Sequence, residues 1–109
     1  MSAKFRGRYP ETPTVLAPAT PVDVTIPTGG GTHTSIVVHN GGVNPITALS
    51  YAIQPLARAG SFTAAPSGLP LAAGASLTIS IIDQPCTAVV VRAESTLGST
   101  ANISAVSQG

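Results

Sequence analysis

The strongest constraint on the fold of this chain is an alternation of apolar and polar residues with a period of two. The segment 76–81 reads Ser-Leu-Thr-Ile-Ser-Ile, and the segments 22–26 and 101–105 alternate in the same way. Such a period places every second side chain on one face of a β-strand. No segment carries the 3.6-residue period of an amphipathic helix. The pattern therefore predicts an all-β protein.

Turn-forming residues separate the alternating segments at intervals of about 8–12 residues, as in Asn40-Gly41-Gly42 and Leu97-Gly98-Ser99. Short strands at this spacing predict an antiparallel Ig-like β-sandwich of about seven strands. The pattern of cysteine and tryptophan that marks antibody domains is absent, so the expected likeness is one of topology. The predicted strands lie near residues 22–26, 34–39, 46–53, 61–65, 75–81, 87–94 and 100–106.

The alternation also predicts which side chains face the core. Val37, Ile82 and Val90 fall outside the predicted core faces and are candidates for contact with another molecule. The predicted core residues are Val22, Val24, Ile26, Thr34, Ile36, Val38, Leu49, Tyr51, Ile53, Leu77, Ile79, Ile81, Val89, Val91, Ala93, Ala101, Ile103 and Ala105.

The first 21 residues differ in composition from the rest of the chain. They contain Pro10, Pro13, Pro18 and Pro21, a spacing that blocks helix and regular sheet and favours an extended, polyproline-like path. We therefore expect an extended, proline-rich, basic N-terminal arm at residues 1–21 and a β-sandwich domain at residues 22–109. The chain without residues 1–21 is expected to fold.

Charge is scarce and unevenly placed. Charged residues make up 8% of the sequence, and the net charge of +1 combines +3 in residues 1–8 with −2 in the remainder, where two arginines oppose four carboxylates. A free monomer with so little charge is poorly protected against association. We therefore expect the protein to pack against copies of itself or against a larger assembly.

The tip of the expected arm gathers the basic and aromatic side chains Lys4, Phe5, Arg6, Arg8 and Tyr9. Arginine, tyrosine and phenylalanine often anchor protein interfaces, so these residues are the candidate partner-binding site. The same residues could bind phosphates and stack on bases, but three charges are few for a nucleic-acid site. A solvated terminus without a partner is the third alternative.

Groups able to perform catalysis are few. His33 and His39 would share one face of a strand about 20 Å apart, which is too far for one metal ion. Cys86 has no evident base and fits a small buried residue better than a nucleophile, and Gly29-Gly30-Gly31 fits a turn better than a phosphate-binding loop. We expect no enzymatic activity, no cofactor and no metal site.

The sequence also bears on location. Its longest apolar runs are far shorter than the roughly 20 residues that cross a bilayer, and Pro10 and Glu11 interrupt any apolar signal segment. With Cys86 as the single cysteine, no intrachain disulfide can form. We expect no membrane partner and synthesis in the cytoplasm.

The basic, proline-punctuated N-terminal segment and the charge-poor sandwich together resemble the small decoration, or cement, proteins of tailed bacteriophage heads. The segment Leu71-Ala72-Ala73-Gly74-Ala75-Ser76-Leu77-Thr78-Ile79 is similar to many Ig-like domains of phage and bacterial surface proteins. The resemblance implies a virion protein that binds the major capsid protein or another virion protein on the outer capsid surface. It further implies a homo-oligomer, often a trimer, whose arm reinforces the shell.

A second hypothesis is an Ig-like module of a phage tail or fibre that binds carbohydrate or a cell surface. Such a module uses exposed aromatic side chains, and the predicted domain contains only Tyr51 and Phe62. The sequence does not identify the partner, the oligomeric state, the binding face, a host-surface ligand, or a position on head or tail.

Overall fold

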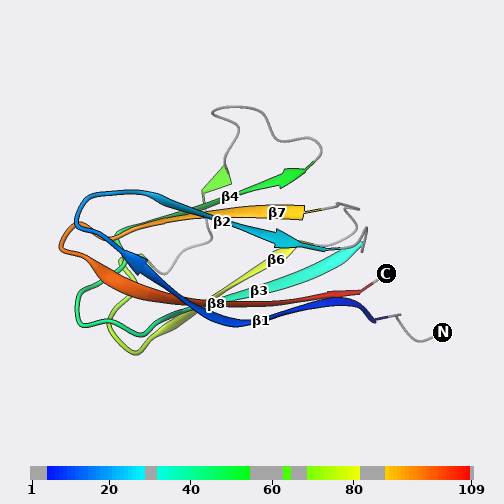
Figure 1. Cartoon of the computed structure of the whole chain (residues 1–109), viewed down its shortest axis with the longest axis horizontal. Coiled ribbons are helices and arrows are strands. Elements are labelled where there is room, and N and C mark those ends of the chain that lie inside the picture. The colour runs from blue at the N-terminus through cyan, green and yellow to red at the C-terminus, as the bar shows by residue number, and fades with distance from the viewer. Residues whose placement is uncertain (1–4, 29–31, 55–62, 65–68, 82–87, 109) are drawn as a thin grey trace.

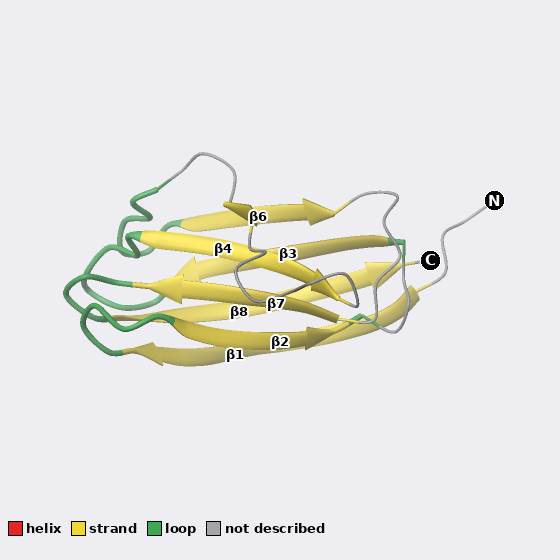
Figure 2. Ribbon diagram, turned by 90° about the horizontal axis from the view of Figure 1, so that it is seen from above, coloured by secondary structure: helices red, strands yellow, loops and turns green. Residues whose placement is uncertain are grey.

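The computed structural model describes residues 5–28, 32–54, 63–64, 69–81 and 88–108. In these ranges the chain forms strands and loops with no helix, arranged as two facing antiparallel sheets (Figures 1 and 2). The strands are β1 (Phe5–Leu16), β2 (Val22–Pro27), β3 (His33–Asn40), β4 (Ala48–Gln54), β5 (Thr63–Ala64), β6 (Ser76–Ile81), β7 (Ala88–Glu94) and β8 (Ser99–Gln108). The predicted all-β antiparallel sandwich is confirmed.

The order of the strands refines the expected topology. One sheet has the order β1-β8-β3-β6 and the other the order β2-β7-β4-β5, so strands that follow one another in the chain alternate between the sheets until β5. In the immunoglobulin fold the first two strands are neighbours in one sheet, whereas here β1 and β2 lie in different sheets. Eight strands in two four-stranded sheets with this order form a jelly roll.

The first strand corrects the expectation of an arm separate from the domain. β1 pairs antiparallel with β8 along its length, from Phe5 opposite Gln108 to Leu16 opposite Ser99. Figure 1 shows β1 and β8 side by side, with the start of β1 and the end of β8 at the same end of the sandwich. The seven expected strands are all present, and the segment expected as an arm supplies the eighth.

The prolines of β1 fit a sheet because the strand lies at its edge. Pro10 and Glu11 together occupy the step in register between Tyr9, opposite Ala105, and Thr12, opposite Ile103. An extra residue in a bulge and a position on an edge strand are the two places where a strand tolerates proline. The proline spacing indicates an extended path, but it does not exclude pairing on one side.

The core lies between the two sheets and follows the predicted alternation. On β6, Leu77, Ile79 and Ile81 are buried while the serines and threonine between them are exposed. The last residue of β1, Leu16, is also buried in this core. Burying a leucine contributes about 1.5–3 kcal/mol, so removal of residues 1–21 removes core stabilisation together with an edge strand. Such a truncation is not expected to leave the fold intact.

Candidate interaction surface

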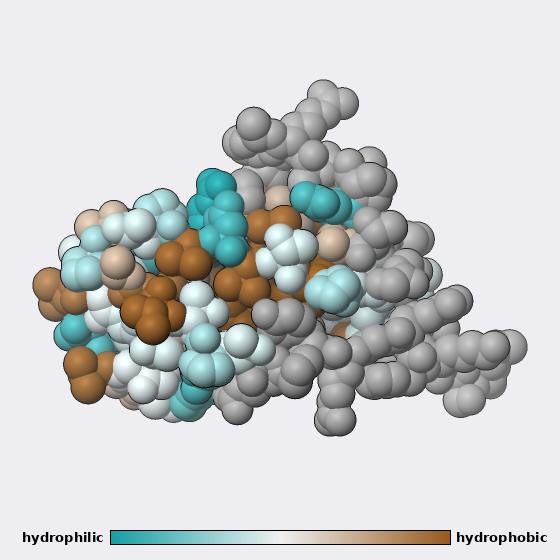
Figure 3. All heavy atoms as spheres, in the orientation of Figure 1, coloured by the Kyte–Doolittle hydropathy of each residue, from teal (hydrophilic) through white to brown (hydrophobic). Residues whose placement is uncertain are grey.

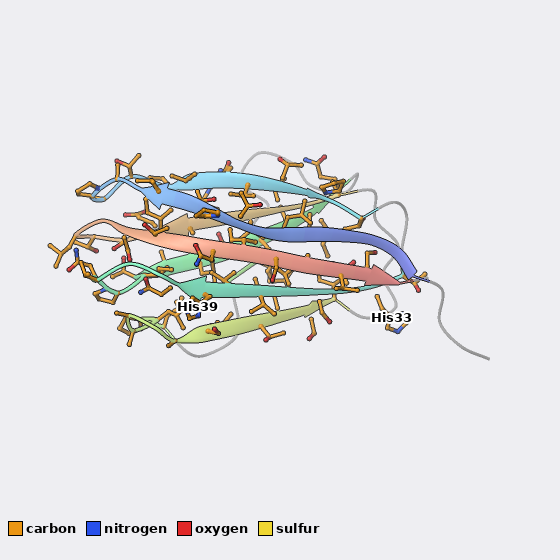
Figure 4. All side chains as sticks on the ribbon, turned by 60° about the horizontal axis from the view of Figure 1, so that its bottom comes forward. His33 and His39 are labelled. Carbon is orange, nitrogen blue, oxygen red and sulfur yellow. The ribbon has the colours of Figure 1, made fainter. Side chains whose placement is uncertain are left out.

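The outward side of the sheet β1-β8-β3-β6 presents a surface without charge among the side chains that the structure describes. Because inward and outward residues alternate, β3, β6 and β8 place small polar and β-branched side chains on this side. We call it the neutral face (Figure 4 looks onto this sheet). Its residues are His33, Ser35, Val37, His39, Ser76, Thr78, Ser80, Thr100, Asn102, Ser104 and Val106.

The described charged side chains lie on the other sheet. Asp23 on β2 and Arg92 on β7 stand opposite each other on its outward side, and Glu94 follows two residues later on the same side of β7. Lys4, Arg6, Arg8, Glu11, Arg58 and Asp83 are the other charged residues, and their side chains are outside the described part. Among the described side chains, the two outward faces of the sandwich therefore differ in charge.

Asp23 and Arg92 form a bidentate ion pair. Arg92 Nε donates to Asp23 Oδ1 at 2.8 Å, and Arg92 Nη2 donates to Asp23 Oδ2 at 3.1 Å. These hydrogen bonds hold the pKa of the Asp23 carboxyl below its ordinary value of 3.8, against the opposing effect of partial burial. The pair is well exposed, so solvent screens it and its contribution to stability is small.

We predict that this contribution disappears in acid. The folded pKa of Asp23 is below the unfolded value, so the unfolded chain takes up the proton first as the pH falls. The stabilisation is present above the unfolded pKa and is lost as the pH drops through the folded one. Urea unfolding of the wild type and Asp23→Asn, from neutral pH to about pH 2, should give a stability difference that shrinks in acid. A difference independent of pH would contradict this assignment.

The two histidines lie on the neutral face at opposite ends of β3 (Figure 4), as their spacing predicts. His39 Nδ1 is 2.7 Å from Ser76 Oγ on β6, and His33 Nδ1 is 3.0 Å from Thr32 Oγ1. Within the described ranges no three His, Cys, Asp or Glu residues are grouped so that they could hold a metal ion. Cys86 and Gly29-Gly30-Gly31 lie outside these ranges.

The residues expected to bind a partner are placed only in part. Lys4 lies outside the described residues. Phe5, Arg6, Arg8 and Tyr9 belong to the first half of β1, where the backbone pairs with residues 105–108 of β8. They therefore lie along the edge of the sheet that carries the neutral face, at the end of the sandwich where β8 ends (Figure 1).

The apolar residues expected outside the core have different surroundings. Val37 is half-buried on the neutral face, between Ser104 on β8 and Thr78 on β6. Val90 lies on the outward side of the other sheet, between Thr25 and Ala52, and is 9% exposed. Ile82 is outside the described residues. Of the three, Val37 is the one shown on an accessible face.

A buried asparagine organises the end of the sandwich where β1 ends, although its sequence context predicts only a turn. Asn40 Nδ2 donates to the backbone oxygens of Asn44 and Leu71, each at 2.8 Å. Its Oδ1 accepts from Gly42 N at 3.0 Å and from Ser99 Oγ at 2.7 Å. One side-chain amide thus joins three segments that are distant in sequence. An Asn-Gly pair predicts a turn, and nothing local predicts these longer connections.

Ser95 joins further loops at the same end. Its Oγ donates to Pro45 O at 2.7 Å, and its backbone oxygen accepts from Ala19 N at 2.9 Å and Gly98 N at 3.2 Å. These bonds tie the β1–β2 linker, at residues 17–21, to the β7–β8 turn. The loops at this end are therefore tied by polar contacts in addition to the burial of Ile46 and Leu71 in the core.

Three large apolar side chains are exposed at this end of the sandwich, one near the end of β1 and two on the loops. Val15, Val43 and Leu97 are 77%, 88% and 66% exposed. Val15 is opposite Thr100 at the start of β8, and Asn44 Nδ2 donates to the backbone oxygens of Leu97 and Gly98. We call these three residues the apolar tip. Figure 3 shows apolar side chains at this end of the molecule, on the left.

The aromatic residues of the domain offer no described stacking surface. Tyr51 is half-buried and packs against the core, whereas the side chains of Phe5, Tyr9 and Phe62 are outside the described part. No helix in the described ranges has the length and apolarity needed to cross a membrane. Comparison with protein-family models gives no match, and neither does comparison with curated proteins.

Proposed function

We propose that this protein is a non-enzymatic virion structural protein that binds the outer surface of a bacteriophage head as a decoration, or cement, protein. The observation that carries the proposal is the neutral face. A regular sheet surface of serine, threonine, asparagine and valine loses little side-chain entropy when it is covered and has no described charge to desolvate. Such a surface is suited to close packing against a large, ordered assembly.

The placement of β1 supports the same proposal. The basic and aromatic positions Phe5, Arg6, Arg8 and Tyr9 border the sheet that carries the neutral face. A shell with acidic or aromatic pockets could therefore meet the neutral face and these positions in one contact, to which Lys4 would add a further charge. The proposed partner is the major capsid protein or another virion protein, and the proposed location is the capsid surface.

The jelly-roll architecture is compatible with this role but does not by itself indicate it. Jelly rolls form viral capsid domains and also lectin domains, so the fold alone favours neither. A carbohydrate- or cell-surface-binding module of a tail or fibre is the alternative function. It needs an exposed aromatic platform, and Tyr51 packs against the core instead.

We predict that a charge at the centre of the neutral face abolishes attachment without unfolding the protein. Val37→Lys introduces a cation that would be desolvated in the contact, and binding to purified virions lacking the protein should fall at least tenfold, equivalent to about 1.4 kcal/mol. The matched control is Thr25→Lys, an exposed strand position on the other sheet, which should bind as the wild type does. Co-sedimentation measures both, and circular dichroism verifies their folding.

Immunogold electron microscopy of the intact virions provides the location. Label distributed over the head is the expected result. Label confined to the tail would support the alternative, and a protein that sediments alone would overturn the capsid proposal. Equal binding by Val37→Lys and the wild type would exclude the neutral face as the contact.

A further inference from the structure

We infer that β1 is an exchangeable strand, which can leave β8 of its own chain and pair with β8 of a second copy of the same protein. This inference concerns self-association and does not depend on the proposed function. Three features carry it: the way in which β1 is held, the linker that follows it, and the apolar tip beside that linker.

In the part of β1 whose side chains the structure describes, the contacts that place it are backbone pairing with β8 and the burial of Leu16. The strand lies at the edge of its sheet and hydrogen-bonds to β8 alone among the strands described. Its described side chains are those of residues 12–16, and of these only Leu16 belongs to the core. A second copy presents the same β8 backbone and the same site for Leu16. Exchange therefore restores every contact of β1 in a symmetric dimer.

The linker between β1 and β2 is short and contains a strained residue. It comprises residues 17–21, with Pro18 and Pro21 on either side of Ala19. Ala19 has a φ of 53°, in the left-handed region that a residue with a Cβ rarely adopts. Short hinges under strain favour domain swapping because an open hinge relieves the strain. Both prolines prefer the extended conformation that the open hinge requires.

The length of the linker determines where the two copies meet. Five extended residues span at most about 17 Å, so the exchanged copies must approach each other through the end that carries the linker. Val15, Val43 and Leu97 are exposed at that end. Their contact in the dimer would cover apolar side chains that the closed monomer leaves in water.

Disulfide trapping between separate chains tests the exchange. Val15 and Thr100 are opposite each other on β1 and β8, where directly opposed Cβ atoms are about 5 Å apart. A Val15→Cys chain and a Thr100→Cys chain of different mass, both also Cys86→Ser, are unfolded together, refolded at high concentration and oxidised with glutathione disulfide. The expected product is a mixed dimer that joins one chain of each kind.

The matched control uses two strands that exchange leaves in one chain. Ser35 on β3 and Ser80 on β6 are also directly opposed and exposed. Mixing Ser35→Cys and Ser80→Cys chains in the same background should give no mixed dimer above the level of random oxidation. Absence of the Val15–Thr100 mixed dimer, or equal yields in the two experiments, would overturn the inference.

Two substitutions at the hinge should shift the equilibrium in opposite directions. Ala19→Gly removes the Cβ penalty of the closed hinge and should disfavour the dimer about fivefold or more per chain. Ala19→Pro can neither adopt a positive φ nor donate to Ser95 O, so it should favour the dimer. Light scattering after size exclusion measures both. A folded, monomeric Ala19→Pro protein would contradict the role of the hinge. These measurements use the purified protein alone. A negative result would therefore contradict strand exchange without bearing on the proposed binding to virions.

Discussion

Replacing Asn40 with alanine should lower the free energy of unfolding by about 3–5 kcal/mol, a large fraction of the stability of a domain of this size. The Asn40 amide makes four hydrogen bonds in a fully buried position. Alanine would leave the backbone oxygens of Asn44 and Leu71 and the donors of Gly42 and Ser99 without this partner. Urea unfolding monitored by circular dichroism measures the change.

A second asparagine provides the control. Asn102 lies on the adjacent strand β8, opposite His39, and its Oδ1 has no hydrogen-bond partner among the described residues. Asn102→Ala should therefore change the free energy of unfolding by no more than about 0.5 kcal/mol. If both variants lost the same stability, the hydrogen-bond network of Asn40 would not be the cause of its effect.

Replacing Gly42 with alanine should cost about 2–4 kcal/mol because the added methyl group has no space. A Cβ at Gly42 would lie 2.6 Å from the backbone nitrogen of Thr100 and 2.9 Å from the Cα of Ser99, and it would overlap Ser99 Oγ. Backbone atoms of β8 cannot move without disturbing its pairing with β1 and β3. The measurement is the shift of the urea midpoint at a constant slope.

The neighbouring glycine is the matched control for this substitution. The three atoms nearest to a Cβ at Gly41 would all belong to the side chain of Asn102, with its Nδ2 at 2.9 Å. That amide can rotate away, so Gly41→Ala should cost less than about 1 kcal/mol. Equal losses at the two glycines would mean that the loop conformation, rather than the close approach to β8, determines the effect.

The strands and their core faces could be predicted from the sequence because both are local properties. Thr34, Ile36 and Val38 on β3 face inward, and Val89, Val91 and Ala93 do so on β7, as the alternation indicates. Val90 is also buried although it lies on the opposite side of its strand. The sequence shows a continuous apolar run at Val89-Val90-Val91. It does not show that Thr25 of β2 and Ala52 of β4 lie beside Val90 in the sheet.

The role of residues 5–16 could not be predicted in the same way. Pro10 and Pro13 indicate that the local backbone is extended, and the backbone is extended both in a free arm and in an edge strand. The choice between these depends on whether a partner strand has a free edge. β8 provides that edge, about 90 residues later in the chain.

The neutral face was predictable in composition but not in place. The scarcity of charge is evident in the sequence, whereas the separation of Asp23, Arg92 and Glu94 from Ser35, Val37 and Ser104 follows from the order of the strands. The Asn40 network depends on the same order, since it joins β3, the segment before β6 and the start of β8.

The sequence by itself determined that the chain is all-β, where most of its strands lie, which side chains face inward and how little charge the surface carries. These properties depend on the period of two and on composition, which each short segment contains. Tertiary structure alone decided that the N-terminal segment is the eighth strand of a jelly roll, that one face carries no described charge, and that one buried amide joins three segments distant in sequence. Each of these depends on hydrogen bonds between residues far apart in the chain, and no local pattern specifies which edges meet.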